Sequence, residues 1–210
     1  MAEEGHCKPG EVLFGTDSHT CNAGAFGQFA TGVGNTDAGF ILGTGKLLIK
    51  VPPTMRFHLD GEMPPYLLAK DLILHIIGEI TVSGGTYKAM EFCGSAIENM
   101  NMEERMTVCN MVVEAGGKNG LCPPDQTTFD YIKGRPYAPK DSHWDQAVEY
   151  WSSLPSDNDA HYDHEIVINS SEIDPMVTWG TSPEDVIAVN GTVPSPDSAK
   201  SENKNKSIER

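Results

Sequence analysis

Basic side chains are scarce in this sequence. Its 210 residues include 15 Lys and Arg against 30 Asp and Glu, which gives a formal net charge of −15 at pH 7. Proteins that bind the nucleic-acid backbone or anionic membranes need clustered basic residues, so the composition argues against both classes. Residues 141–197 contain acidic side chains but no Lys or Arg, and we interpret this stretch as a solvated surface.

The sequence also lacks long apolar runs, a targeting segment and paired cysteine motifs. No run approaches the roughly 18 apolar residues of a membrane span, and the acidic residues 1–4 do not resemble a signal or transit peptide. The cysteines are odd in number and contain no C-x-x-C pair, which argues against a disulfide framework or a thiolate metal pair. We expect a reducing intracellular compartment and buried thiols at most of the five positions: Cys7, Cys21, Cys93, Cys109 and Cys122.

An apolar content of 39%, arranged in periodic blocks, predicts a globular α/β chain. We predict strands at residues 11–16, 46–51, 55–59, 87–93 and 164–168, and helices at 66–80, 102–115, 126–133 and 144–151. Gly residues alternate with apolar side chains at 24–45, and we interpret this region as two short, tightly packed helices. Residues 199–210 have almost no apolar content and are predicted to form a disordered tail.

Asp17, Ser18 and His19 directly follow the first predicted strand, where α/β proteins often place active-site loops. The three side chains offer a carboxylate, a hydroxyl and an imidazole for hydrogen bonding or proton transfer. The alternative is a structural turn, because Asp and Ser often cap backbone N–H groups. A serine hydrolase is less favoured, because adjacent side chains of an extended backbone point to opposite sides and would keep Ser18 away from His19.

The predicted helix at 102–115 carries a second candidate group. Its apolar stripe has spacings of four and three residues and is expected to face the core: Met102, Met106, Cys109 and Val113. Asn110 and Glu114 lie one turn apart on the adjoining face and point the same way. Glu114 is near the helix C-terminus, where the helix dipole disfavours a negative charge, and this placement indicates a functional use. An exposed, solvated Glu is the alternative.

Four segments of the chain stand out together: GTDSHTCNAGAFGQFATGVGNTDAG from residue 15, MEFCG from residue 90, MEERMTVCNMVVEAGGKNGLCPPDQTTFDYIKGR from residue 102, and VTWGTSPEDV from residue 177. In this order they resemble the aconitase superfamily of iron–sulfur hydro-lyases, and within it the large subunits of 3-isopropylmalate dehydratases. The resemblance covers about residues 5–196 and implies a three-layer αβα lobe, of which this chain holds an incomplete part. Homoaconitases share these motifs and are the alternative.

The resemblance implies a hydro-lyase that isomerises 2- and 3-isopropylmalate by dehydration and rehydration, in leucine biosynthesis, at a [4Fe–4S] cluster. It places Asp17, Ser18 and His19 on the family's Asp-Ser-His motif, beside the substrate and water. It also matches Asn110 to an Asn beside the cluster. Glu114 corresponds to a Glu that hydrogen-bonds the hydroxyl or water.

The chain departs from this family at several positions. Asn22 falls where aconitases place an active-site Asn, which is a weaker correspondence. The family's ligand cysteines, in a G-S-C-T segment and a later C-x-x-C pair, do not occur here, so none of the five cysteines is expected to bind the cluster. Arg56 and Arg105 are the only Arg among the first 134 residues, too few to recognise a dicarboxylate. The resemblance implies that the remainder of the large subunit and a small subunit complete the site.

We divide the chain into a Gly-rich α/β part at 1–134, an acidic α/β extension of the same domain at 135–198, and the tail at 199–210. The isolated chain is expected to be inactive and to hold no stable cluster. We expect it in the cytoplasm, with the plastid stroma as the alternative. Two other functions stay open: a non-catalytic remnant or interaction module of this fold, and a metal-independent hydrolase that uses Ser18 and His19.

Overall fold

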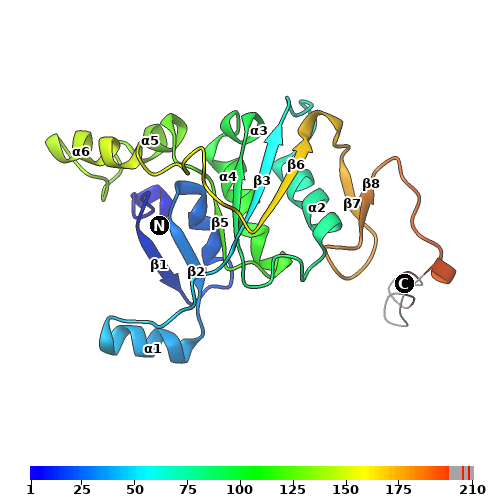
Figure 1. Cartoon of the computed structure of the whole chain (residues 1–210), viewed down its shortest axis with the longest axis horizontal. Helices are drawn as coiled ribbons and strands as arrows, with labels where there is room; N and C mark the ends of the chain where they lie inside the picture. The colour runs from blue at the N-terminus through cyan, green and yellow to red at the C-terminus, as the bar shows by residue number, and fades with distance from the viewer. Residues whose placement is uncertain (199–204, 206–207, 209–210) are drawn as a thin grey trace.

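The computed structural model describes residues 1–198, 205 and 208, and the tail predicted at 199–210 otherwise lies outside the described residues. Its centre is a four-stranded parallel sheet in the order β5-β4-β3-β6, with helices packed beside it (Figure 1). The strands are β3 (Thr54–Asp60), β4 (Ala89–Cys93), β5 (Asn119–Leu121) and β6 (His164–Asn169). The predicted α/β class is confirmed.

Strand β6 comes from the acidic second part of the chain but completes the sheet of the first part. It pairs in parallel with β3, so that Met55 lies opposite His164 and Asp60 opposite Asn169. The boundary predicted between residues 134 and 135 therefore separates two stretches of sequence that share one sheet, and the division into parts stays a prediction.

One part of the core lies between the sheet and helix α2 (Ala69–Ile80). Along β3, Met55, Phe57 and Leu59 are buried, whereas the residues between them are partly exposed, as expected for side chains that alternate between two faces. Helix α2 contributes an apolar stripe to the same core: Leu72, Ile73, Ile76 and Ile77. The helix predicted at 66–80 is confirmed, although it begins later, at Ala69.

Helix α4 (Met102–Asn110) begins at the predicted cap. The Asn101 side chain accepts a hydrogen bond from the Glu104 N–H (3.0 Å), and the Glu104 carboxylate accepts one from the Asn101 N–H (2.9 Å). The chain then continues as the 3₁₀-helix η3 (Met111–Ala115). The α-helix predicted over 102–115 therefore ends early, and its last turn is tighter than predicted.

The other elements surround this centre. In chain order they are η1 (Ala2–Glu4), β1 (Val12–Gly15), η2 (Thr20–Phe26), β2 (Phe29–Gly32), α1 (Asn35–Thr44), α3 (Ser95–Glu98), α5 (Gln126–Ile132), α6 (Ser142–Trp151), η4 (Ser170–Glu172), β7 (Met176–Thr178), β8 (Val186–Ala188) and η5 (Pro196–Ser198). Strands β1 and β2 form a separate parallel pair, and β7 and β8 an antiparallel pair. Among the described residues, no helix has the length and apolarity needed to cross a bilayer.

Two predictions are wrong. Residues 24–45 form the end of η2, strand β2 and helix α1 instead of two tightly packed helices. Strand β2 is short and bounded by Gly, so its period is hard to see in the sequence, and α1 extends away from the sheet as an arm with no buried residue (Figure 1). Residues 46–51 are not a strand, because this apolar run lies on the surface: Leu48 is 98% and Val51 82% exposed.

Gly24 marks a close approach between η2 and the strand β5. A Cβ at this position would overlap the backbone carbonyl of Gly120, and the Gly24 carbonyl is itself held by the Cys122 N–H (3.0 Å). Because neither backbone can move aside freely, the Gly24→Ala substitution is expected to lower the free energy of unfolding by about 1–3 kcal/mol. Urea denaturation followed by circular dichroism measures this loss.

The matched control is Gly39→Ala in the exposed helix α1. Nothing lies within 4 Å of the added methyl group there, so this substitution should be neutral or should stabilise the helix by up to about 1 kcal/mol. Equal unfolding midpoints for the two Ala variants would contradict the close packing of η2 against β5.

Arg105 of α4 is fully buried and paired. Its Nη1 and Nη2 donate to the two carboxylate oxygens of Asp125 (2.9 and 2.7 Å), and Nη2 also donates to the Glu98 carbonyl (3.0 Å). Asp125 is in turn the N-cap of α5, because its Oδ1 accepts a hydrogen bond from the Thr128 N–H (3.2 Å). One ion pair thus connects α4, the start of α5 and the end of α3.

Candidate active site

The loop after β1 gathers Asp17, Ser18 and His19 in one turn. The Asp17 Oδ1 accepts a hydrogen bond from the His19 N–H (2.6 Å), and the Asp17 carbonyl accepts one from the Thr20 hydroxyl (2.7 Å). These bonds close the turn that leads into η2, so Asp17 has the structural role considered as the alternative. Ser18 is exposed and His19 is half-buried, which leaves both side chains accessible to a ligand.

Ser18 and His19 contact each other, and the expectation that they point apart is wrong. The Ser18 Oγ lies 2.8 Å from the His19 Nδ1. The expectation assumed an extended backbone, whereas residues 16–19 form bends and turns. In a turn, successive side chains can lie on the same side of the chain.

His19 also contacts Glu114, which is 95 residues away in the sequence. The His19 Nε2 lies 3.3 Å from the Glu114 Oε1, with side-chain exposures of 38% and 41%. The short helix η3 positions Glu114 for this contact. Ser18, His19 and Glu114 therefore form a continuous path along which a proton can move from a hydroxyl to the imidazole, with the carboxylate stabilising the imidazolium.

The two Asn candidates lie beside this path. Asn22 lines the same hollow as Asp17 and His19. Asn110 ends α4, and its carbonyl accepts a hydrogen bond from the Cys21 thiol (3.4 Å), which ties η2 to α4. Burial raises the pKa of Cys21 to about 11, so this thiol stays protonated. Within the described residues, the Asn110 side chain makes no hydrogen bond to the other candidates.

One hollow, of about 620 Å³, opens beside the loop. Asp17, His19 and Asn22 line it, together with Glu103 and Tyr131. Its volume is in the range of small-molecule sites. The loop predicted from the sequence therefore lines a hollow large enough for a small polar ligand.

A second hollow, of about 340 Å³, contains a residue that the sequence analysis missed. Lys118 lines it together with Asp17 and Ser18, and the Lys118 ammonium lies 5.2 Å from the centre of the Tyr87 ring. Lys118 brings a positive charge close to the loop. No spacing rule could find it, because it follows the Gly116-Gly117 turn and lies outside any helical period.

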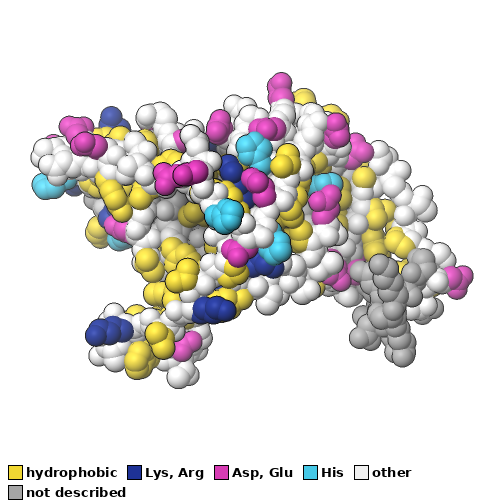
Figure 2. All heavy atoms as spheres, viewed as in Figure 1, with side chains coloured by type: hydrophobic (Ala, Val, Ile, Leu, Met, Phe, Trp, Pro, Cys, Tyr) yellow, Lys and Arg dark blue, Asp and Glu magenta, His cyan; other side chains and the backbone are white. Residues whose placement is uncertain are grey.

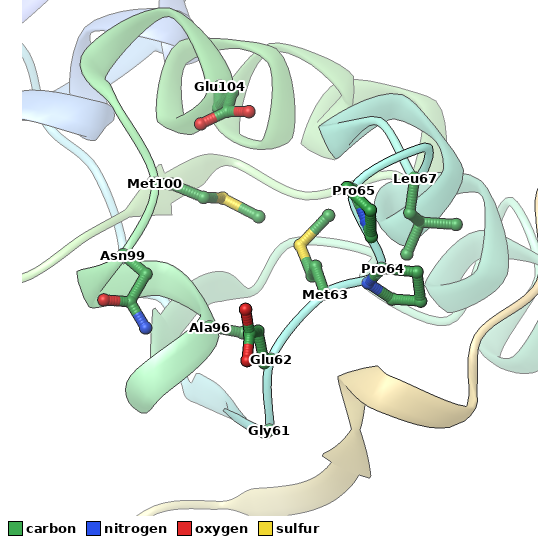
Figure 3. Close-up of a pocket in the computed structure, with 10 residues that line it drawn as sticks. All are labelled: Gly61, Glu62, Met63, Pro64, Pro65, Leu67, Ala96, Asn99, Met100 and Glu104. Atoms are coloured by element: carbon green, nitrogen blue, oxygen red, sulfur yellow. The ribbon is translucent and has the colours of Figure 1, made fainter.

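A third hollow, of about 430 Å³, lies away from the loop, after the ends of β3 and β4 (Figure 3). Met63 and Met100 face each other across it, and Glu62, Asn99 and Glu104 supply its polar side. None of the predicted site residues lines it. Since Glu104 already caps α4, this hollow has no evident link to the chemistry of the loop.

The cysteines do not form a set that fits an iron–sulfur cluster. All five are free, and four are buried: Cys7, Cys21, Cys109 and Cys122. The sulfurs of Cys109 and Cys122 lie 3.7 Å apart inside the core, and burial raises the pKa of Cys109 well above its usual value. Cluster ligands must be thiolates that converge on one point. Across the described part of the chain, no three His, Cys, Asp or Glu side chains are placed to hold a metal ion.

Comparison with known proteins decides the family. The sequence profile of the aconitase family (aconitate hydratase) matches residues 1–210. The chain belongs to the aconitase family. It is 61% identical over 184 residues to the chloroplastic 3-isopropylmalate dehydratase large subunit of Arabidopsis thaliana. The resemblance stated from the motifs is thereby confirmed.

This aconitase-family chain spans only about a third of that relative. The match covers 88% of the chain but 34% of the Arabidopsis subunit. The described sheet and helices are consistent with part of an aconitase-like lobe. The activity of the complete protein therefore belongs to the proposals that follow.

Proposed function

We propose that this chain builds one wall of the active site of an isopropylmalate hydro-lyase. The reaction removes water from 2-isopropylmalate and adds it back to give 3-isopropylmalate, as in leucine biosynthesis. The contact between His19 and Glu114 (3.3 Å) carries the proposal, because it joins the Asp-Ser-His loop to the η3 segment in one proton-transfer unit. The 61% identity to a named dehydratase large subunit supports this substrate over that of a homoaconitase.

Each candidate residue receives a role within this wall. His19 accepts and returns a proton, and Glu114 holds the imidazole and hydrogen-bonds the substrate hydroxyl or water. Ser18 orients the substrate, while Asp17 fixes the turn and handles water beside it. These assignments follow from the short contacts of the loop and from the family motif.

Asn22 is proposed to contact the substrate, and Asn110 is proposed to lie beside the cofactor. Asn22 lies in the hollow beside the loop. Asn110 is four residues before Glu114 and next to the buried Cys21. Their amides would donate and accept hydrogen bonds without changing charge during the reaction.

The remaining parts of the site are proposed to come from outside this chain. The cysteines here do not fit a [4Fe–4S] cluster, and Arg105 is committed to Asp125 inside the fold. We therefore assign the cluster ligands, the Arg residues that bind substrate carboxylates and the substrate base to the remainder of a large subunit and to a small subunit. Cytoplasm and plastid stroma are both proposed locations, and the chloroplastic relative favours the second.

A chimera tests the proposed function. This chain replaces the matching segment of the Arabidopsis large subunit, and the product is expressed with a small subunit under anaerobic conditions. We expect the chimera to turn over 2-isopropylmalate. The ultraviolet absorbance of the unsaturated dicarboxylate measures this turnover. A folded chimera without turnover, beside an active parent protein, would instead identify the chain as a non-catalytic remnant.

One observation favours a second function. The Ser18–His19 contact of 2.8 Å, continued to Glu114, has the order of groups found in serine hydrolases. A fluorophosphonate probe, which labels activated serines, separates the two functions. Labelling of Ser18 that disappears in Ser18→Ala would support the hydrolase, whereas the hydro-lyase proposal expects no labelling.

A further inference from the structure

One face of the central sheet is partly open to solvent and carries polar side chains. On β3, Arg56, His58 and Asp60 alternate with the buried residues and therefore share this face. The register places Cys93 of β4 and Val167 of β6 on either side of His58. Val167 is 71% exposed, and in Figure 2 histidine and acidic side chains gather over β3 and β6.

Cys93 lies at the centre of a charged network on this open face. The Arg56 Nε donates to its sulfur (3.1 Å), and the His58 Nδ1 is 3.6 Å from the same sulfur. The His58 Nε2 lies 2.8 Å from the Asp60 Oδ2. The Asp60 Oδ1 accepts hydrogen bonds from the Ser95 N–H (3.2 Å) and hydroxyl (3.3 Å). The Cys93 thiol thus contacts the His58 imidazole, and the imidazole contacts a carboxylate that Ser95 holds in place.

The hydrogen bonds determine which ring nitrogen can act as a base. The backbone N–H of Ser95, and then His58, lower the pKa of Asp60, which therefore stays a carboxylate. It accepts the proton of the His58 Nε2, and this leaves Nδ1 free to accept the thiol proton. Burial raises the pKa of Cys93, and Arg56 only partly offsets this rise. The thiol therefore needs a base to become a nucleophile, and His58 is in contact with it.

The groups around this network are themselves paired. Arg56 contacts Glu165 of β6 (3.2 Å) and lies over the Tyr162 ring at 4.8 Å. Glu91 of β4 accepts hydrogen bonds from the Ser156 hydroxyl (2.9 Å) and from Tyr162 (3.4 Å). These contacts hold the guanidinium beside the Cys93 sulfur, where it can stabilise a thiolate.

We propose that Cys93 is a thiol-modification site that reacts with low-molecular-weight disulfides, with His58 as its base and Asp60 as the positioning residue. His58 takes the proton from Cys93, whose sulfur attacks one sulfur of the disulfide R–S–S–R. The S–S bond of the reagent breaks, and a new bond forms between Cys93 and R–S. The Cys93 sulfur is oxidised, and the released R–S⁻ is the reduced product, which takes the proton from His58.

The other thiols of the chain provide an internal comparison. Cys7, Cys21, Cys109 and Cys122 are buried, whereas Cys93 is partly exposed. Burial raises the pKa values of Cys7, Cys21 and Cys109, as it does that of Cys93. The difference is the base: none of the four buried thiols hydrogen-bonds to a His in the described structure, whereas Cys93 lies 3.6 Å from the His58 Nδ1. Cys93 should therefore react first and should be the main site of modification in the folded chain.

Oxidised glutathione is the probe for this test. The 210-residue chain and the chimera described above are incubated with it, and adducts are located by peptide mass spectrometry over time. Among the five cysteines of this chain, we expect the first adduct on Cys93 in both proteins, its release by dithiothreitol, and its loss in Cys93→Ser. First modification at another of these five cysteines, or no adduct on Cys93 in the folded chimera, would overturn the proposal.

Two His variants separate base chemistry from fold stability. His58→Gln is expected to slow the modification about 10²-fold near neutral pH and to recover as rising pH ionises the thiol directly. Asp60→Asn should slow it less and should shift the same pH profile. His75→Gln is the matched control, because His75 pairs with Glu79 on α2 (3.4 Å) away from any cysteine. Equal rates and pH profiles for His58→Gln and the wild-type chain would refute the role of His58.

Discussion

Glu114→Gln in the chimeric large subunit is expected to lower kcat by about 10²–10⁴-fold, with KM little changed. In the unsubstituted chain the His19 Nε2 lies 3.3 Å from the Glu114 carboxylate. The Gln side chain has the same size, and its amide oxygen can still accept a hydrogen bond from this nitrogen. It cannot supply the negative charge that stabilises a protonated imidazole. Steady-state kinetics with 2-isopropylmalate measure the loss.

Glu79→Gln is a matched control for this prediction. Glu79 also pairs with a half-buried His, since its Oε1 lies 3.4 Å from the His75 Nε2, but this pair is on α2. The control should keep the parent kcat. If both Gln variants lose activity equally, the effect of Glu114→Gln is structural. If Glu114→Gln keeps full activity, the His19–Glu114 pair has no part in proton transfer.

Asp125→Ala is expected to give the largest loss of stability, about 3–5 kcal/mol in the free energy of unfolding. It would leave the guanidinium of the fully buried Arg105 without its carboxylate partner, and the Arg105 Nε already lacks a hydrogen bond among the described residues. The substitution also removes the N-cap of α5. Urea denaturation monitored by circular dichroism gives the change.

Two further variants distinguish an unpaired charge from a missing contact. Arg105→Met combined with Asp125→Ala removes both charges, so it should be more stable than Asp125→Ala alone. Glu11→Ala breaks the partly exposed pair with Lys8 (3.7 Å) and should cost no more than about 1 kcal/mol. If the double variant is as unstable as Asp125→Ala, the lost cap explains the effect instead of the buried charge.

Local signals predicted much of the fold because they act over a few residues. The Asn101–Glu104 capping box and the apolar stripe of α2 were readable from spacing alone, and both are present. The same rules failed at residues 46–51, where a run rich in apolar side chains lies on the surface. A pattern shows that side chains are apolar, but it does not show whether a partner strand is available.

At the candidate site, too, local patterns identified single residues, but they did not predict contacts between residues far apart in the sequence. Asp17, Ser18 and His19 were visible as a polar cluster after a strand, and Glu114 as an acid near a helix end. Their meeting was not visible, because 95 residues separate His19 from Glu114, and only the family resemblance named both for one site. The Ser18–His19 contact was missed because the backbone there turns, and composition does not fix backbone angles.

The parallel pairing of β3 with β6 also affects how the chain folds as it is synthesised. One edge of β3 stays unpaired until a segment far along the sequence has been synthesised. The hydrogen bond from the Thr54 N–H to Asp163 beside this edge joins residues 109 positions apart. Pairings of this separation form slowly, and an open strand edge can pair with another copy in the meantime. The segment that finally covers this edge lies within residues 141–197, which carry negative charges and no Lys or Arg. Mutual repulsion between such segments would keep unfinished chains apart until each has closed its own sheet.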